Sequence, residues 1–151
     1  MFKELKLSSS MNKIVWSQIF ETGIDKIDVQ HQLLIDLINK ASHLLRQEHS
    51  LENLQNIVND LIRYTQYHFE TEENLMQTYE YALHMPKDYE QHIEEHCNFS
   101  TKVLAIHNQM REGTAIEREE IINFLCEWLI DHIHHTDKKL GKFLENSMND
   151  G

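Results

Sequence analysis

The sequence contains little glycine and proline, and this scarcity limits the fold classes open to it. Of its 151 residues only four are glycine and one is proline, about 3% against a usual share of about 12%. Turn-rich all-β folds, collagen-like repeats and flexible linkers are excluded, because each depends on these two residues. A single domain of a few long helices joined by few turns remains, since a chain of this length suits one domain.

Cysteine, long apolar runs and positive charge are also scarce. Cys97 and Cys126 are too few for a disulfide scaffold, and their apolar helical surroundings predict buried free thiols. No apolar run approaches the length of a membrane span, and the first residues lack the apolar core of a signal peptide. Lys and Arg number 14 against 25 Asp and Glu, a net charge of −11 that argues against nucleic acid and anionic membranes as partners. We expect a soluble cytoplasmic protein.

Four segments carry apolar residues at helical spacing. A polar arm over residues 1–13 is predicted to be flexible, and residues 14–28 form an ordered, extended lead-in whose Trp16, Ile19 and Phe20 should pack on the helices. The predicted helices cover residues 28–47, 50–78, 86–112 and 114–144. Their short connections favour an all-α fold, an antiparallel up-down-up-down four-helix bundle with its domain over 14–147.

The predicted helix ends follow from capping signals. Asp28 and Ser50 are candidate N-caps of the first two helices. Pro86 suits the first turn of the third helix, which should stop at Gly113. Thr114 and Glu117 then form a capping box for the fourth helix.

Histidine is unusually abundant, with 11 residues, and several histidines fall on the inward faces of the predicted helices. His68 with Glu72, and His92 with His96, are spaced i, i+4 and therefore share a helix face. His31 lies near the start of the first helix and His132 past the middle of the fourth, at heights compatible with both pairs. Asp137 follows five residues later.

A single histidine on an apolar face is more often a hydrogen-bonded core residue than a metal ligand. Five histidines and two carboxylates on the inward faces of four helices are harder to explain in that way. Buried charges must be paired or coordinate metal, so such a cluster without metal would be strongly destabilising. The pattern therefore favours a metal site.

The ligand types limit the choice of metal. Imidazole and carboxylate without thiolate suit Fe, Zn or Mn, and seven ligands are too many for one tetrahedral zinc. They would serve two six-coordinate irons if both carboxylates bridge, with a solvent-derived oxygen as a third bridge and one position open. His132 and Asp137 do not fit simply, because i, i+5 residues on an ideal α-helix point about 140° apart. Either a π-type bulge realigns them or the pairing is wrong.

At these residues the sequence resembles the hemerythrin family, specifically the bacterial single-domain hemerythrins. The matching segments are WSQIFETGIDKIDVQH (16–31), HFETEENLM (68–76), HIEEHCNF (92–99) and WLIDHIHHTD (128–137). The resemblance spans residues 15–144, and the combined spacing, including the i, i+5 pair, is highly specific.

The resemblance implies a non-haem centre of two Fe ions, joined by an oxo or hydroxo bridge, that binds O2 reversibly. His92, His96 and His132 would then bind one iron, and His31 and His68 the other, whose sixth position stays open. Glu72 and Asp137 would bridge the two. The residues at positions that wall the O2 pocket in the family are Leu34, Phe69, Trp128, Leu129 and Ile133. These five also suit plain core packing.

One segment departs from the family pattern. The connection from Glu72 to His92 is a few residues longer than usual and carries Tyr79, Tyr81 and His84. The spacings of the ligands within each helix are intact. The difference therefore concerns pocket access and autoxidation more than the centre itself.

Three functions stay open at this stage. The first is an O2-binding protein, a carrier, store or sensor rather than an enzyme, which we expect to be a monomer; a signalling role would require a separate protein partner. The second is a di-iron redox enzyme that reduces peroxide or NO. The third is a bundle whose histidines take up metal adventitiously. No further titratable pair is evident beside the pocket as a proton relay, which favours binding.

Overall fold

The protein is almost entirely helical. The computed structural model describes residues 14–46, 51–113 and 118–150, and no strand occurs within these ranges. The elements, in chain order, are the 3-10 turn η1 (Gln18–Phe20), α2 (Asp25–Arg46), α3 (Leu51–Thr78), α4 (Tyr81–His84), α5 (Pro86–Glu112), α6 (Arg118–Asp131), the π-helix η2 (His132–Asp137) and α7 (Lys138–Asp150). None of these described helices has both the length and the apolar composition needed to cross a membrane.

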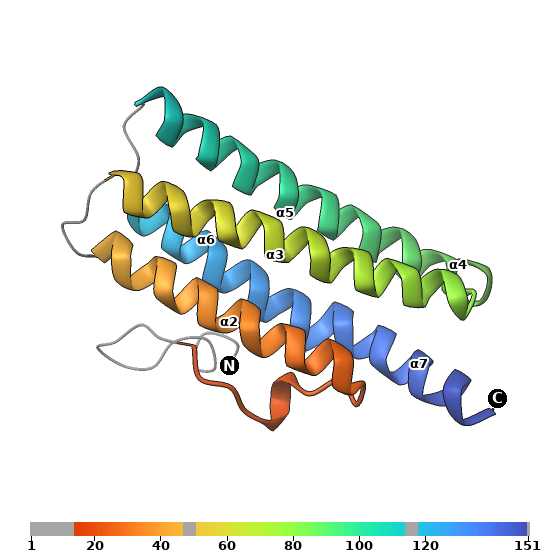
Figure 1. Cartoon of the computed structure of the whole chain (residues 1–151). Coiled ribbons are helices and arrows are strands. Elements are labelled where there is room, and N and C mark those ends of the chain that lie inside the picture. Colours follow the sequence, from red (N-terminus) through yellow and green to blue (C-terminus); the bar gives the residue numbers. More distant parts are fainter. Residues whose placement is uncertain (1–13, 47–50, 114–117, 151) are drawn as a thin grey trace.

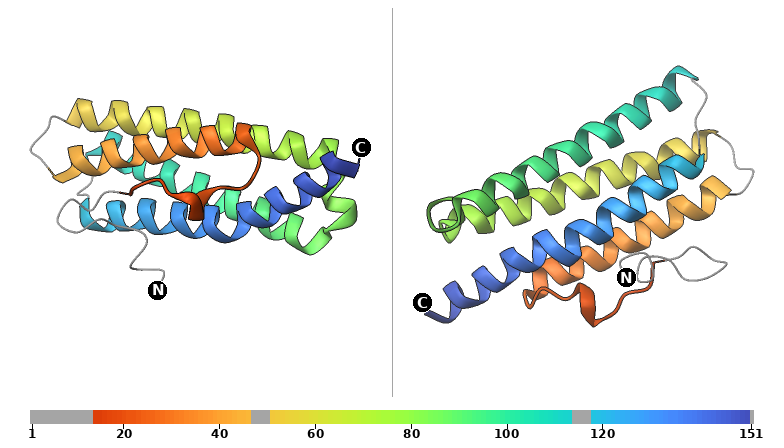
Figure 2. Two further views of the ribbon diagram at one scale, coloured as in Figure 1. Left: turned by 90° about the horizontal axis from the view of Figure 1, so that it is seen from below. Right: turned by 180° about the vertical axis from the view of Figure 1, so that it is seen from behind.

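The long helices form the predicted up-down-up-down bundle (Figure 1). α2 packs against α3 and α6, and α3 packs against α5. The segment α6–η2–α7 is one continuous helical rod, and the views in Figure 2 show it running the length of the bundle. Each long helix therefore presents one face to the interior at the level where η2 lies.

The first helix begins earlier than predicted. α2 starts at Asp25, so Asp28 lies inside its first turn and is not the N-cap. The Asp28 carboxylate instead accepts hydrogen bonds from the backbone N–H and the hydroxyl of Thr22, both at 2.8 Å. The hydroxyl of Thr22 accepts a bond from the backbone N–H of Ile24 at 3.2 Å. The lead-in is therefore anchored to the helix by an interaction that the capping pattern alone did not reveal.

The third helix has the predicted ends. Pro86 occupies its first turn and Gly113 ends it in the left-handed region, with φ of 75°. The long connection before α5 contains the short helix α4, and Glu80 at its start also adopts a left-handed conformation. Tyr81 is buried against Phe143 of α7, with ring centroids 4.9 Å apart. The additional residues in this connection thus fill the end of the bundle.

The last helix differs from the prediction in two respects. It continues to Asp150 instead of ending near Leu144, and it is not α-helical throughout, because the π-helix that the i, i+5 spacing allowed as one alternative interrupts it at 132–137. The predicted caps at Ser50 and at Thr114 with Glu117, the arm at 1–13 and the last residue predicted for the first helix lie outside the described residues.

The lead-in packs on the bundle as expected. Ile14 and Phe20 are buried, and Trp16 and Ile19 pack against the main apolar core. This segment includes η1 and is therefore only partly extended.

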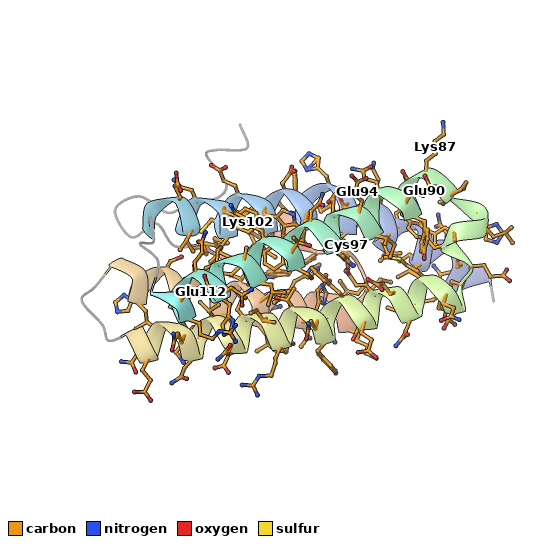
Figure 3. All side chains as sticks on the ribbon, turned by 90° about the horizontal axis from the view of Figure 1, so that it is seen from above. Lys87, Glu90, Glu94, Cys97, Lys102 and Glu112 are labelled. Carbon is orange, nitrogen blue, oxygen red and sulfur yellow. The ribbon has the colours of Figure 1, made fainter. Side chains whose placement is uncertain are left out.

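Of the two cysteines, Cys126 is buried but Cys97 is exposed, which contradicts the prediction for Cys97. Because His96 points inward, the next residue along the helix faces outward, beside Glu90 and Glu94 on the outer side of α5 (Figure 3).

Candidate metal centre

Seven side chains from every long segment of the bundle converge in its interior. They are His31 of α2, His68 and Glu72 of α3, His92 and His96 of α5, and His132 and Asp137 of η2. All seven are 2% exposed or less. The structure therefore brings together the complete ligand set predicted from the sequence.

The seven residues form two overlapping groups whose potential ligand atoms lie within 4.8 Å of one another. The first group is Glu72, His92, His96, His132 and Asp137; the second is His31, His68, Glu72 and Asp137. Both carboxylates belong to both groups, whereas each histidine belongs to one. The arrangement has the form of two adjacent cation sites with two shared carboxylates, one site having three histidines and the other two.

The distances show how closely the two carboxylates hold the histidines. Glu72 Oε1 lies 3.0 Å from His96 Nε2, 3.3 Å from His92 Nε2 and 3.5 Å from His68 Nε2.

Asp137 uses its two oxygens for different halves of the cluster. Its Oδ2 is 2.7 Å from His31 Nε2, and its Oδ1 is 3.0 Å from His132 Nε2. The two halves of the cluster therefore meet at this carboxylate.

Several of these atoms are buried and form no well-oriented hydrogen bond, even where a carboxylate oxygen lies close by. They are His31 Nε2, His68 Nε2, His132 Nε2, Glu72 Oε2 and both carboxylate oxygens of Asp137. Unpartnered buried polar atoms are rare because each loses its hydration without replacement. Nitrogen and oxygen lone pairs directed at one small volume are the donor set that divalent cations bind. The residues present thus fit a pair of metal ions.

The π-helix resolves the alternative that the spacing of His132 and Asp137 left open. In an α-helix these i, i+5 residues would point in different directions, but η2 covers both and widens the turn between them. His132 Nε2 and Asp137 Oδ1 consequently lie 3.0 Å apart, and both side chains are buried. The π-helix therefore brings the two side chains together in the interior, and their joint role as metal ligands remains a prediction.

Burial raises the pKa values of the two carboxylates in the cluster, and the neighbouring histidines lower them. Burial and the Asp137 charge both disfavour ionisation of Glu72, yet His68, His92 and His96 hold its pKa below the usual range. Burial likewise opposes ionisation of Asp137, and His132 and His31 lower its pKa. Both carboxylates are therefore anionic at neutral pH, as metal ligands must be.

Burial and nearby charges shift the pKa values of His68, His92 and His132 in different directions. Burial disfavours the charged form of His92, but its contacts with Asp137 and Glu72 raise its pKa to about 9. Burial also disfavours the charged form of His132, but Asp137 and Glu95 raise its pKa to about 10. Burial lowers the pKa of His68 to about 4 in spite of the attraction of Glu72. Without a metal ion, His92 and His132 are therefore protonated at neutral pH and place positive charge beside the two carboxylates.

Further polar side chains contact the outward-facing Nδ1 atoms of two histidines, and no spacing pattern in the sequence indicated them. His96 Nδ1 lies 2.9 Å from Glu73 Oε2, and His132 Nδ1 lies 2.7 Å from Glu95 Oε1. Thr136 of η2 donates a hydrogen bond to the same Glu95 oxygen at 2.7 Å. Two ionisable groups, Glu73 and Glu95, therefore lie beside the centre, although no titratable pair that could serve as a proton relay was evident from the sequence. The only sequence signal was adjacency to a predicted ligand.

Comparison with known proteins agrees with this geometry. A family model described as the hemerythrin HHE cation binding domain matches residues 22–144. The chain belongs to the hemerythrin family. The match covers the segments that carry all seven clustered residues.

Named members of the family align with most of the chain. A bacteriohemerythrin of Clostridium acetobutylicum is 30% identical over 129 residues, 83% of this chain and 96% of its own length. A bacteriohemerythrin of Pseudomonas aeruginosa is 27% identical over 140 residues, 93% of this chain and 87% of its own. A myohemerythrin of Theromyzon tessulatum is 28% identical over 124 residues, 82% and 88% of the two chains.

A solved structure also matches the fold. The crystal structure of wild-type hemerythrin superposes with a TM-score of 0.78 and 26% identity, covering 87% of this chain and 97% of that one. The bundle is therefore a hemerythrin bundle.

The apolar residues predicted to wall a pocket belong to the main core cluster, in which Trp128 is only partly buried. Phe69 stacks on the His96 ring at a centroid distance of 3.7 Å and an interplanar angle of 8°. Trp128 stacks on the His132 ring at 4.4 Å and 14°. Leu34, Leu129 and Ile133 are buried in the same cluster. Aromatic rings thus shield the half of the centre with three histidines.

Two further histidines near the site in sequence do not join it. His134 Nδ1 lies 3.4 Å from the backbone carbonyl of Ile19, and His135 is exposed with Nδ1 3.5 Å from Asp131. His134 therefore contacts the lead-in, and His135 faces solvent.

Proposed function

We propose that this protein binds O2 reversibly at a non-haem di-iron centre, as a carrier, store or sensor. The observation that carries the proposal is the unequal division of the cluster: two adjacent cation sites share Glu72 and Asp137, but one has three histidines and the other two. With equal coordination numbers, the site with two histidines has one position left for an external ligand. The names hemerythrin and bacteriohemerythrin of its relatives agree with this proposal.

The proposed cofactor is two Fe ions with an oxo or hydroxo bridge. His92, His96 and His132 would hold one ion, His31 and His68 the other, and Glu72 and Asp137 would bridge them. When bound, such a pair supplies a redox-active site that can take up O2. The donor set alone also suits zinc or manganese, so the metal must be determined directly.

The apolar residues have a separate proposed role. Leu34, Phe69, Trp128, Leu129 and Ile133 would line the O2 pocket and keep bulk water from it, since water and protons promote loss of a reactive bound species. The Phe69 ring supports this role, because it stacks on His96 and also lies 6.0 Å, centroid to centroid, from the ring of His68 on the half left open to O2. Trp128 stacks on His132 of the other half.

Absorption spectroscopy of the iron-loaded protein tests the proposal. Aerated protein should show oxygen-dependent charge-transfer bands that fade under argon and return in air, with two irons per chain by elemental analysis. Far fewer than two irons per chain would reject the di-iron centre. Bands that never respond to oxygen would reject reversible binding while leaving the centre intact. Size-exclusion chromatography of the same sample tests the proposed monomeric state.

A di-iron redox enzyme that reduces peroxide or NO is the second candidate. Glu73 and Glu95 favour it, because ionisable groups in contact with His96 and His132 could carry the protons that such reductions consume. Rapid turnover of peroxide or NO with an added reductant would support the enzyme over the carrier. Stable oxygenation with negligible turnover would support the carrier.

A further inference from the structure

Gln30 connects His68 to the protein backbone through a chain of three hydrogen bonds. Its side-chain Oε1 lies 2.7 Å from His68 Nδ1, and its Nε2 donates to Thr71 Oγ1 at 3.2 Å. Thr71 Oγ1 in turn donates to the backbone carbonyl of Tyr67 at 3.1 Å. Gln30, His68 and Thr71 are all buried, so water does not compete for these bonds.

The backbone end of this chain determines the direction of every bond in it. A carbonyl oxygen can only accept, so the Thr71 hydroxyl uses its single proton on Tyr67. That hydroxyl can then only accept from Gln30, which turns the amide NH2 towards Thr71 and the amide oxygen towards His68. His68 Nδ1 must therefore carry a proton, because two lone pairs would repel at 2.7 Å.

The consequence lies on the other side of the imidazole ring. A neutral histidine protonated at Nδ1 has a free lone pair on Nε2. His68 Nε2 faces the cluster, 3.5 Å from Glu72 Oε1 and without a hydrogen-bond partner. The chain of bonds thus prepares this nitrogen as a metal ligand.

On the other half of the centre, two of the three histidines have a carboxylate partner at Nδ1, and His92 Nδ1 has no hydrogen-bond partner. His96 Nδ1 meets Glu73 and His132 Nδ1 meets Glu95, whereas His68 Nδ1 meets an uncharged amide. An anionic acceptor draws the proton of an imidazole away from the ring and makes the opposite nitrogen a stronger electron donor. A neutral amide does so less.

We propose that Gln30 is a positioning residue that fixes His68 in its Nδ1–H tautomer and makes the half with two histidines less electron-rich than the half with three. The inequality favours the ferrous state on the half that the proposed function leaves open to O2. This inference rests on the proposed metal centre but not on O2 binding itself.

NMR of the metal-free, 15N-histidine-labelled protein at neutral pH tests the tautomer. We expect Nδ1–H at His68 in the unmodified chain and in Thr71→Ser, which keeps the hydroxyl. Thr71→Val removes the acceptor that orients the amide, and Gln30→Leu removes the amide, so both should populate the Nε2–H form, which can donate to Glu72. Nε2–H in the unmodified chain, or no change in Thr71→Val, would overturn the proposal. Neither result depends on iron or O2.

The midpoint potential of the iron-loaded protein under argon tests the electronic consequence. Gln30→Glu adds a third carboxylate acceptor and should lower the potential, whereas the matched change Glu95→Gln on the other half should raise it. An unchanged potential in Gln30→Glu, or a shift of the same sign in both variants, would overturn the inequality. Failure to bind O2 with the expected potentials intact would contradict only the proposed function.

Discussion

His132 Nε2 and Asp137 Oδ1 lie 3.0 Å apart although five residues separate them along one helical segment. The π-helix η2 makes this contact possible by placing one additional residue in the turn. It also turns Thr136 towards Glu95, which holds the His132 ring from behind. A single local change of helix type therefore positions both a candidate ligand and its supporting contacts.

Removal of the Glu72 carboxylate, which belongs to both ligand groups, should disrupt the pair of metal ions. We expect Glu72→Ala to lower the iron content from two ions per chain to one or fewer and to abolish the paired-iron spectrum, because Glu72 belongs to both ligand groups. Elemental analysis and absorption spectroscopy are the measurements. Glu70→Ala, an exposed position on the same helix, is the control and should keep both ions. Normal iron content in Glu72→Ala would contradict the assignment.

Metal loading should release protons. Because the pKa values of His92 and His132 are about 9 and about 10 without metal, both rings are protonated at neutral pH and must lose a proton to bind. Calorimetric titration with metal at pH 7.5 in buffers of different ionisation enthalpy should show about two protons released per chain, and metal affinity should increase as the pH rises. Heats that do not depend on the buffer would refute this expectation.

The metal-free protein should become less stable in alkaline solution. The folded-state pKa values of His92 and His132 lie above their ordinary value of 6.5, so their stabilising charge is fully present below about pH 6.5 and is lost as the pH rises through 9 to 10. Urea denaturation of the metal-free protein should therefore give a lower midpoint at pH 10 than at pH 7. A constant midpoint over this interval would show that the two histidines are not charged in the fold.

The Phe69 ring should matter more for the lifetime of the oxygenated protein than for folding. Phe69→Leu keeps an apolar side chain and should lower the free energy of unfolding by about 1 kcal/mol, but it removes the ring stacked on His96 and should accelerate autoxidation. Phe143→Leu is the matched control, because Phe143 packs in the second core cluster. Equal autoxidation rates in Phe69→Leu and Phe143→Leu would show that Phe69 has no specific role in the O2 pocket.

Gly141 should resist a substitution that helices normally favour. Glycine to alanine stabilises an open helix by about 0.5–1 kcal/mol, but a Cβ at Gly141 would lie 2.7 Å from Thr22 Cβ and would also meet the carbonyl oxygen of Thr22. We expect Gly141→Ala to lower the free energy of unfolding by about 1–3 kcal/mol. Asn146→Ala, at an exposed position of the same helix, should instead be neutral or slightly stabilising. Urea denaturation measures both.

The sequence by itself determined the features that depend on residues close together in the chain, namely the long helices and the residues that share a helix face. The scarcity of glycine and proline and the apolar periodicity predicted an all-α bundle, and the i, i+4 spacing put His68 with Glu72 and His92 with His96 on common faces. Their convergence followed from the up-down topology that short connections require. The long helices and the two i, i+4 pairs were therefore predictable, because helical periodicity is a local property, whereas it did not account for His132 with Asp137.

Tertiary structure alone decided the features that depend on contacts between helices. The spacing of His132 and Asp137 allowed a π-helix or a wrong pairing, and the interior of the bundle selected the π-helix by burying both side chains against the other ligands. The spacing of residues along the chain does not reveal the roles of Gln30 and Glu95. Each contacts a histidine on another helix, 38 residues away in the chain for Gln30 and 37 for Glu95. The abundance of histidine indicates the centre, but the fold decides which acceptor each ring faces.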